Sequence, residues 1–298
     1  MTEQQSIDAL GELLGQYAHQ CDSDLNRWLV QDGVPASLAE AMRYCVLGGG
    51  KRLRPALVYM AAETVGKSEP EEITRRAAVA AEMVHCSSLV HDDLPAMDDD
   101  ELRRGRPTAH IRFGEAMAIL VGDAMLMRAF NVLAEANGPL SARLVAELTA
   151  GAGPAGMIAG QVADMGLCEL PDGFEGLRYI HSHKTAALIR SSARMGAICG
   201  RASPRQLAAI TQYAENLGLT FQLIDDMLDV TGSMTTLGKT TGKDASSGKR
   251  THIAEIGLEA SRTLCNELTN AAISALKPLG EDASKLERLA TILSQRTR

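Results

Sequence analysis

Residues 204–229 read PRQLAAITQYAENLGLTFQLIDDMLD, and residues 70–94 read PEEITRRAAVAAEMVHCSSLVHDDL. In both stretches apolar residues recur at spacings of three and four, and neither contains a proline after its first position. This is the period of an amphipathic α-helix, and at 1.5 Å per residue each helix would be about 36 Å long. The two stretches therefore predict two long helices.

The same period continues through most of the chain, and strand-like alternation of Val, Ile and Thr is hard to find in it. The sequence therefore predicts an all-α fold. We expect one domain over residues 1–298, since large single domains of this length are common. The polar stretch 232–250 breaks the period and predicts a long loop, and loops longer than about 15 residues are usually functional or disordered.

Local signals mark several predicted helix ends. A serine followed three residues later by Glu or Gln has the spacing of a capping box. This spacing occurs at three predicted helix starts: Ser37 with Glu40, Ser68 with Glu71, and Ser203 with Gln206. Helix stops are expected at 48–50, 94–95 and 231–232, where glycine or proline interrupts the pattern.

Composition and charge exclude several classes of protein. Hydrophobic residues make up 45% of the chain and charged residues 22%, which argues against wholesale disorder. The net charge of −7 argues against nucleic acid as the main partner. Six cysteines are spread along the chain with no Cys-x-x-Cys pair, so we expect reduced thiols and neither a disulfide frame nor a zinc site.

The apolar runs and the N-terminal segment indicate where in the cell the protein is expected. The first 20 residues are polar and acidic, without the cationic start and apolar core of a signal peptide. No run approaches 18 uninterrupted apolar residues, so we expect no stable membrane insertion. These features predict a cytoplasmic protein.

Each long helix closes with a cluster of aspartates: Asp92, Asp93 and Asp98 in the first, and Asp225, Asp226 and Asp229 in the second. A carboxylate at a helix C-terminus is disfavoured by about 0.3–1 kcal/mol, so stability gives no reason for either cluster. Apolar neighbours such as Leu89 and Leu223 indicate buried ends, where carboxylates need cations. Oxygen ligands without Cys or His pairing favour Mg²⁺ over zinc, and no EF-hand loop for calcium is present.

Basic residues lie beside both clusters, where a magnesium ion would complete its shell with phosphate oxygens. Lys51, Arg52 and Arg54 follow the glycines at 49–50, and Arg103, Arg104 and Arg106 follow the first aspartate cluster. Lys239, Lys243 and Lys249 lie in the polar loop, and Lys184 begins an amphipathic segment. The combination predicts a site for phosphate groups.

In these residues the sequence resembles the all-helical trans-prenyl diphosphate synthases, that is, the farnesyl and geranylgeranyl diphosphate synthases of bacterial type. The motif D-D-x-x-x-x-D is similar to the first cluster, and D-D-x-x-D to the second. Further similar segments are 49–55 (GGKRLRP), His85, 103–105 (RRG), Gln161 with Asp164, 184–185 (KT), 221–222 (FQ) and 238–244 (GKTTGKD). The resemblance covers most of the chain.

The resemblance implies a single-domain bundle of ten or more helices around a deep central cavity, usually assembled as a homodimer. It implies head-to-tail condensation of isopentenyl diphosphate with an allylic diphosphate (dimethylallyl, geranyl or farnesyl), with release of diphosphate. The products would be farnesyl and/or geranylgeranyl diphosphate. About three magnesium ions would act per site, with Asp92, Asp98 and Asp225 as principal ligands and Asp93, Asp226 and Asp229 as direct or water-mediated support.

Substrate roles follow from the same resemblance. The diphosphate of isopentenyl diphosphate would bind Lys51, Arg54, His85 and Arg104, and the allylic diphosphate would bind Arg103, Lys184 and Lys239. Lys249 belongs to the same substrate-binding set. The family commonly reads Lys-x-Thr-Tyr-Pro from this lysine, whereas residues 249–253 here read KRTHI, which leaves the role of Lys249 and lid closure open.

Lys184, Thr185 and Gln222 are the catalytic candidates. Ionising an allylic carbon–oxygen bond releases a diphosphate that metal and lysine charge would stabilise. The dipoles of Thr185 and Gln222 would face the remaining carbocation, unless each side chain makes only an ordinary buried hydrogen bond. In this family the departing diphosphate is thought to take the proton, so no general base is required.

Ser87 and Ser88, five and four positions before Asp92, are candidates for setting product length. Farnesyl-type enzymes carry an aromatic residue five positions ahead, and Ser87 would leave that depth open. This favours a twenty-carbon product, unless Met83, residues 117–127 or bulk from a neighbouring helix close the cavity lower down.

Three other readings remain. A class I terpene cyclase would not be expected to carry the second aspartate motif or sites for a second diphosphate, and a head-to-head synthase would show D-x-x-x-D motifs. A non-catalytic regulatory subunit of a heteromeric synthase would usually lack aspartates of one cluster, and all six are present here.

Overall fold

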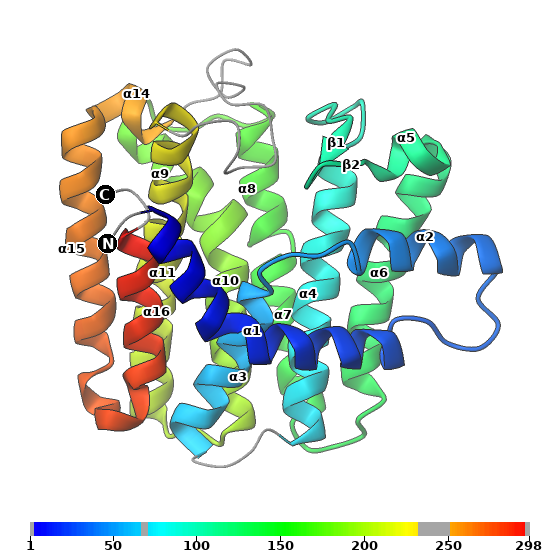
Figure 1. Ribbon diagram of the computed structural model, residues 1–298, viewed down its shortest axis with the longest axis horizontal. Helices are drawn as coiled ribbons and strands as arrows, with labels where there is room; N and C mark the ends of the chain where they lie inside the picture. Colours follow the sequence, from blue (N-terminus) through cyan, green and yellow to red (C-terminus); the bar gives the residue numbers. More distant parts are fainter. Residues whose placement is uncertain (1–2, 67–70, 232–250, 296–298) are drawn as a thin grey trace.

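The structure is a computed structural model that describes residues 3–66, 71–231 and 251–295, and Figure 1 shows the arrangement of its elements. The chain begins with four helices: α1 (Glu3–Trp28), α2 (Ala36–Val46), α3 (Leu53–Gly66) and α4 (Glu72–Asp92). A short antiparallel hairpin follows, with strands β1 (Leu102–Arg103) and β2 (Arg106–Pro107).

The remaining described elements are helical. They are α5 (Ala109–Phe113), α6 (Glu115–Ala134), α7 (Ser141–Ala152), α8 (Met157–Asp164), α9 (Phe174–Ile180), the π-helical turn η1 (His181–Ala186), α10 (Ala187–Cys199), α11 (Pro204–Thr231), α14 (His252–Ile256), α15 (Leu258–Ala275), the 3₁₀ segment η2 (Lys277–Ala283) and α16 (Ser284–Ser294). The all-α prediction is confirmed.

The two predicted long helices are α4 and α11, with 21 and 28 residues. The capping box at the start of α11 is confirmed, because the Ser203 backbone N–H donates to the Gln206 amide oxygen at 2.9 Å and the Gln206 N–H donates to the Ser203 hydroxyl at 3.4 Å. The capping box predicted at Ser37 is wrong. Helix α2 begins at Ala36, directly after Pro35, so Ser37 lies inside the helix. Ser68 and the predicted loop 232–250 lie outside the described residues.

Small residues let the helices pack closely. Helices α3 and α10 are buried along almost their whole lengths and lie against each other. A Cβ atom at Gly196 of α10 would collide with the Val58 carbonyl of α3, and one at Gly122 of α6 would collide with the His91 ring of α4. One continuous hydrophobic core results, to which helices from α1 to α16 contribute.

One described helix, α6, is long and apolar enough to cross a membrane by length and composition. It packs against α4 along its length and also contacts α2, α5 and α7. Some of its apolar side chains remain exposed, among them Ile119, Leu120 and Met127. Its apolar character is thus partly that of a core helix and partly that of an exposed apolar face.

Helices α4 and α11 run in the same direction through the bundle, so their C-terminal ends lie at the same end of the molecule (Figure 1). The β1–β2 hairpin lies at the end of α4, and α14 lies at the end of α11. Both aspartate clusters are therefore carried to one end of the structure.

Candidate active site

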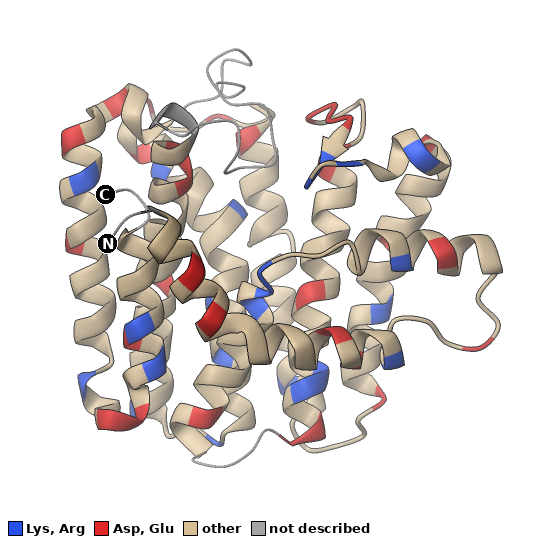
Figure 2. Cartoon of the chain, in the orientation of Figure 1, with Lys and Arg blue, Asp and Glu red and all other residues tan. Residues whose placement is uncertain are grey.

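A buried arginine fixes the basic loop that connects α2 to α3. Arg52 adopts a positive φ of 50°, and its guanidinium donates to Asp22 at 2.8 Å, to Glu82 at 2.7 Å and to the Val46 carbonyl at 2.7 Å. Three anchored donors hold the loop where it enters α3. Figure 2 shows positive charge at this point of the chain.

A cavity of about 490 Å³ lies beside this loop. Its polar wall comes from the basic loop and the start of α3, and from α4, the hairpin and α11, which lie far from them in the sequence. The residues on that wall are Lys51, Arg52, Arg54, Glu82, His85, Arg104 and Asp225. All four residues that the resemblance assigned to the isopentenyl diphosphate are thus in the wall of one cavity, together with an aspartate of the second cluster.

Positive charge dominates this wall and affects the pKa values of its side chains. Burial lowers the pKa of His85 well below its usual value, and the nearby cations Arg54 and Arg104 lower it further. The His85 imidazole is therefore neutral at pH 7. Burial also lowers the pKa of Arg54, whose Nε atom is buried without a hydrogen-bond partner among the described residues. An anion in the cavity would relieve both conditions.

Apolar side chains close the same cavity from the two ends of the chain. Leu10 and Leu14 of α1 and Leu293 of α16 line it, next to Phe221 of α11. Sequence reasoning missed these leucines, because they belong to ordinary amphipathic helices and carry no motif. They exclude water from one side of the cationic wall.

Just after α4, Asp93 forms an ion pair with Arg103. It is buried, and the Nε atom of Arg103 donates to its two oxygens at 2.8 and 3.0 Å. Arg103 also approaches Asp100 at 3.4 Å. The pair joins the β1–β2 hairpin to the C-terminus of α4, so Arg103 already has a carboxylate partner in this structure.

Asp92 and Asp98 lie side by side at the same helix end. The Asp98 backbone N–H donates to the Asp92 carbonyl at 2.8 Å, and both residues are half-buried. Burial raises the pKa of Asp92, the Asp98 carboxylate raises it further, and Lys184 opposes the shift. Two crowded carboxylates, of which Asp92 has a raised pKa, offer only oxygen ligands and fit a hard divalent cation such as Mg²⁺.

Asp225 and Asp226 of α11 face different surroundings. Asp225 is exposed and lines the cavity, whereas Asp226 is 3% exposed. The Gln222 amide donates to Asp226 Oδ1 at 3.0 Å, and the His252 backbone N–H donates to Oδ2 at 3.0 Å. Burial alone would raise the pKa of Asp226, but hydrogen bonds from His252 and Gln222 lower it. The side chain of Asp229 lies outside the described part of the structure.

Two of the three catalytic candidates, Thr185 and Gln222, are joined by a hydrogen bond. The Thr185 hydroxyl donates to the Gln222 amide oxygen at 2.9 Å, and Gln222 continues to Asp226. Lys184 pairs with Asp164 of α8 at 2.6 Å. The neighbouring Gln161 has a buried Nε2 atom without a partner among the described residues. Lys184 and Thr185 lie in η1, a π-helical turn, and such turns are frequent at functional sites.

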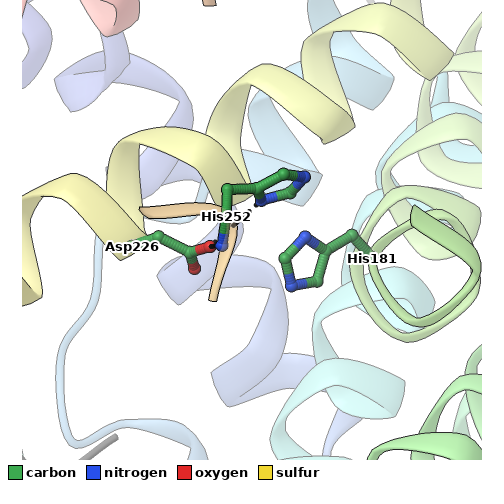
Figure 3. A group of neighbouring side chains, drawn as sticks. All are labelled: His181, Asp226 and His252. Atoms are coloured by element: carbon green, nitrogen blue, oxygen red, sulfur yellow. Dashed lines mark hydrogen bonds and ion pairs between the residues drawn. The ribbon is translucent and has the colours of Figure 1, made fainter. Parts of the chain in front are cut away.

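Sequence reasoning missed a second feature around Asp226. His181 at the start of η1 and His252 at the start of α14 are both buried, and their ring centroids are 4.5 Å apart (Figure 3). The His252 Nδ1 atom lies 3.1 Å from Asp226 Oδ2. Burial lowers the pKa of His181 to about 4. The histidine at 252, where the family commonly has tyrosine, was the only available signal.

Ser87 and Ser88 occupy the α4 positions considered for product length. The Ser87 hydroxyl is buried and donates to the Gly122 carbonyl of α6 at 2.9 Å, so it lies between the two helices. The Ser88 hydroxyl donates to the His85 carbonyl at 2.9 Å within α4. Lys239 and Lys249, the remaining substrate-binding candidates, lie outside the described residues.

Comparisons with known proteins identify the family of this chain. The family model for polyprenyl synthetase matches residues 35–290. The chain is 46% identical over 268 residues to geranylgeranyl pyrophosphate synthase 11, chloroplastic, of Arabidopsis thaliana, covering 87% of this chain and 74% of the relative. It is 45% identical over 270 residues to farnesyl diphosphate synthase of Escherichia coli (strain K12), covering 88% and 90%.

A solved structure gives the same result. The apo structure of an FPP/GFPP synthase from Zymomonas mobilis superposes with a TM-score of 0.82 at 33% identity, covering 96% of this chain and 98% of that one. The sequence family and the fold therefore agree. The chain belongs to the polyprenyl synthetase family.

Proposed function

We propose that the protein is a magnesium-dependent short-chain trans-prenyl diphosphate synthase. It joins isopentenyl diphosphate head to tail to an allylic diphosphate and releases diphosphate, giving farnesyl and/or geranylgeranyl diphosphate. The observation that carries this proposal is the cavity of about 490 Å³, which is lined by cations of the basic loop, the start of α3 and the hairpin together with Asp225 of the second aspartate cluster. Membership of the polyprenyl synthetase family supports it. The chain acts as a single domain over residues 1–298.

The cationic wall binds the diphosphate of isopentenyl diphosphate. Lys51, Arg54 and Arg104 supply charge, and the neutral His85 ring supplies one N–H donor. Guanidinium groups match phosphate oxygens with paired donors, and the partly dry surroundings strengthen each contact. The leucines from α1 and α16 face the hydrocarbon side of the same cavity.

Asp92, Asp98 and Asp225 are the principal magnesium ligands, with about three ions per site. Asp93, Asp226 and Asp229 support them. For Asp93 and Asp226 this support is indirect, because their carboxylates already accept hydrogen bonds from Arg103 and from His252. Bound magnesium would neutralise the charge that builds up on the departing diphosphate.

The allylic diphosphate is held by Arg103, Lys184 and Lys239, with Lys249 as a further contact. Lys184 is close enough to Asp92 to lower its pKa, so it lies between the first aspartate cluster and Asp164. An arriving diphosphate competes with Asp164 for this ammonium group. Lys184 thereby stabilises the leaving group.

Thr185 and Gln222 stabilise the carbocation. The Thr185 hydroxyl donates a hydrogen bond to the Gln222 amide oxygen, so the lone pairs of the hydroxyl oxygen remain available to face positive charge. Gln222 is held in turn by Asp226. The departing diphosphate removes the proton from the condensed product, and no side chain is needed as a base.

Ser87 favours a product longer than fifteen carbons, because a small side chain stands between α4 and α6 at this depth. Met83 and Met125, both buried, are the residues that would end the tail below it. Sizing the products of the purified protein tests this. If no product is longer than fifteen carbons, the prediction that the tail passes Ser87 is rejected.

The protein forms a homodimer in the cytoplasm. Helices α5 and α6 carry the exposed apolar residues Ile111, Ile119, Leu120 and Met127, whose exposed fractions lie between 46% and 67%. An exposed apolar face of this kind is usually buried against a partner, and the same face of a second copy of the chain would bury it. Leu120→Glu should shift the mass measured by light scattering from dimer to monomer, whereas Leu167→Glu, at an exposed leucine after α8, should not.

The activity is tested with labelled isopentenyl and dimethylallyl diphosphates. The isolated protein should release inorganic diphosphate and form longer prenyl diphosphates only when magnesium is added. Asp92→Ala and Asp225→Ala should abolish turnover and keep helical content by circular dichroism. No turnover by the wild-type protein alone, with activity on adding a homologous subunit, would favour the regulatory alternative. Cyclic hydrocarbon products would favour a terpene cyclase.

A further inference from the structure

Three buried side chains outside the cavity wall converge from three separate elements. His181 begins η1, Asp226 belongs to α11, and His252 begins α14. One ligand atom from each lies within 4.8 Å of the other two, and all three residues are buried. Figure 3 shows the two imidazoles and the carboxylate around one common space.

The hydrogen bonding of this cluster is incomplete. The Nδ1 atom of His181 is buried and has no hydrogen-bond partner among the residues that the structure describes. His181 is only 6% exposed, and its ring lies next to the ring of His252. Buried polar atoms in native proteins almost always have a partner. A ring nitrogen without one, beside a second imidazole and a carboxylate, indicates a ligand that completes the group.

The spacing of the cluster suits a metal ion. Ligands of a tetrahedral zinc ion with bonds of 2.0–2.2 Å are about 3.3 Å apart. The His252 Nδ1 and Asp226 Oδ2 atoms are already 3.1 Å apart. Small side-chain rotations would bring the His181 ring from at most 4.8 Å to the same spacing.

The surroundings of the carboxylate also match those of a metal ligand. Asp226 Oδ1 accepts from Gln222, and Oδ2 accepts the His252 backbone N–H. Gln222 is itself held by Thr185. Metal-binding carboxylates are usually oriented by such hydrogen bonds, and a carboxylate oxygen keeps a second lone pair for the ion.

We propose that His181, Asp226 and His252 bind one transition-metal ion, of the class of Zn²⁺ or Co²⁺, at a site separate from the magnesium sites. Two imidazoles and one carboxylate favour such ions over Mg²⁺, which prefers oxygen ligands alone. Three protein ligands leave a fourth position for water. The ion joins α14 to α11 and η1.

The separation from the magnesium sites follows from the direction of adjacent side chains. Residues that follow one another in an α-helix point about 100° apart. Asp225 lines the cavity, whereas Asp226 is buried against His252. Magnesium at Asp225 and a transition metal at Asp226 would therefore occupy different faces of α11.

Cobalt binding tests the proposal without measuring turnover. The full chain is stripped with EDTA, supplied with excess Mg²⁺ and no diphosphate, and titrated with Co²⁺ while its visible ligand-field absorption is recorded. We expect one Co²⁺ per chain, displaced by Zn²⁺. His181→Phe and His252→Phe should each weaken Co²⁺ binding by at least about 100-fold. Phenylalanine at 252 keeps a ring that can pack edge-to-face on Phe174, as His252 does.

Two control variants sharpen the outcome. His19→Ala removes an exposed histidine of α1, and Asp92→Asn removes a carboxylate of the first aspartate cluster; both should keep the cobalt spectrum. Absence of cobalt binding, an unchanged affinity in both Phe variants, or loss of the spectrum in Asp92→Asn would overturn the proposal.

A measurement on the wild-type protein covers the case in which the Phe variants do not fold. X-ray absorption at the cobalt edge should show two imidazole ligands, and none or one would overturn the proposal. These readouts do not depend on prenyl transfer. Failure of this site and failure of the proposed function are therefore distinguishable.

Discussion

Arg52 and Glu82 form an ion pair in the protein core, with 2.7 Å between Nη1 and Oε1 and with both side chains nearly inaccessible to solvent. Glu82 lies on α4, three residues before His85, and Arg52 lies one residue after Lys51. The pair therefore holds the basic loop against the helix that carries the first aspartate cluster. An ion pair without net charge thus positions the other charged residues of the cavity wall.

Arg52→Met should destabilise the protein by about 3–5 kcal/mol, because it leaves the buried Glu82 carboxylate without its partner. Urea denaturation measures the free energy of unfolding. Arg112→Met is the matched control: its partner Glu40 is 3.6 Å away and both side chains are exposed, so the expected change is below about 1 kcal/mol. Equal losses in the two variants would contradict the structural role of Arg52.

Arg103→Lys should lower kcat/KM by about 10- to 100-fold. A lysine keeps the charge but cannot donate to both oxygens of Asp93, as the arginine does. Steady-state kinetics with both diphosphate substrates measures the effect. Arg106→Lys, on the same hairpin, retains a cation over the Tyr44 ring and should change kcat/KM less. A larger loss in Arg106→Lys would reject this account of the hairpin.

Ser87→Phe should shorten the products. The phenyl ring would replace a hydroxyl that lies between α4 and α6, and overpacking there should cost about 1–3 kcal/mol of stability. Chromatography of dephosphorylated products gives the chain length. Ser87→Ala removes only the hydrogen bond to Gly122 and should leave the product distribution unchanged. An unaltered distribution in Ser87→Phe would show that the tail does not pass this residue.

Acid should weaken the fold partly through His85. Its pKa in the folded protein is held well below the usual value of about 6.5, because burial and the neighbouring arginines disfavour the imidazolium. The unfolded chain binds the proton more readily, so this contribution to stability is complete above about pH 6.5 and is lost as the pH falls.

The corresponding measurement is urea denaturation at pH 7, 6 and 5. His85→Gln should show a smaller loss of stability on acidification than the wild-type protein. His19→Gln, at an exposed histidine of α1, should follow the wild-type curve. A steeper pH dependence in His85→Gln would contradict the assigned direction of the pKa shift.

The aspartate clusters illustrate how far the sequence could predict the site. Apolar neighbours placed both clusters at buried helix ends, and Asp92 does end α4. The sequence could not show that Asp93 would pair with Arg103 or that Asp226 would accept hydrogen bonds from His252. That choice depends on Arg103 in a hairpin and on His252, 26 residues beyond Asp226.

Helix boundaries show a similar limit. Ser203 caps α11 as predicted, since its box is completed by Gln206. Ser37 has the same spacing but lies within α2, because the chain turns into the helix directly after Pro35. The cavity wall contributed by Leu10, Leu14 and Leu293 has no local signal, since it arises only from the packing of α1 and α16 near the basic loop.

The contribution of both α1 and α16 to that wall has a consequence for biosynthesis. Leu10 and Leu14 are synthesised long before Leu293, although all three line the same cavity. A nascent chain that has already formed α3 and α4 would present its cationic surface open to water until α16 docks. Tight capture of isopentenyl diphosphate should therefore begin only after α16 has been synthesised and has docked.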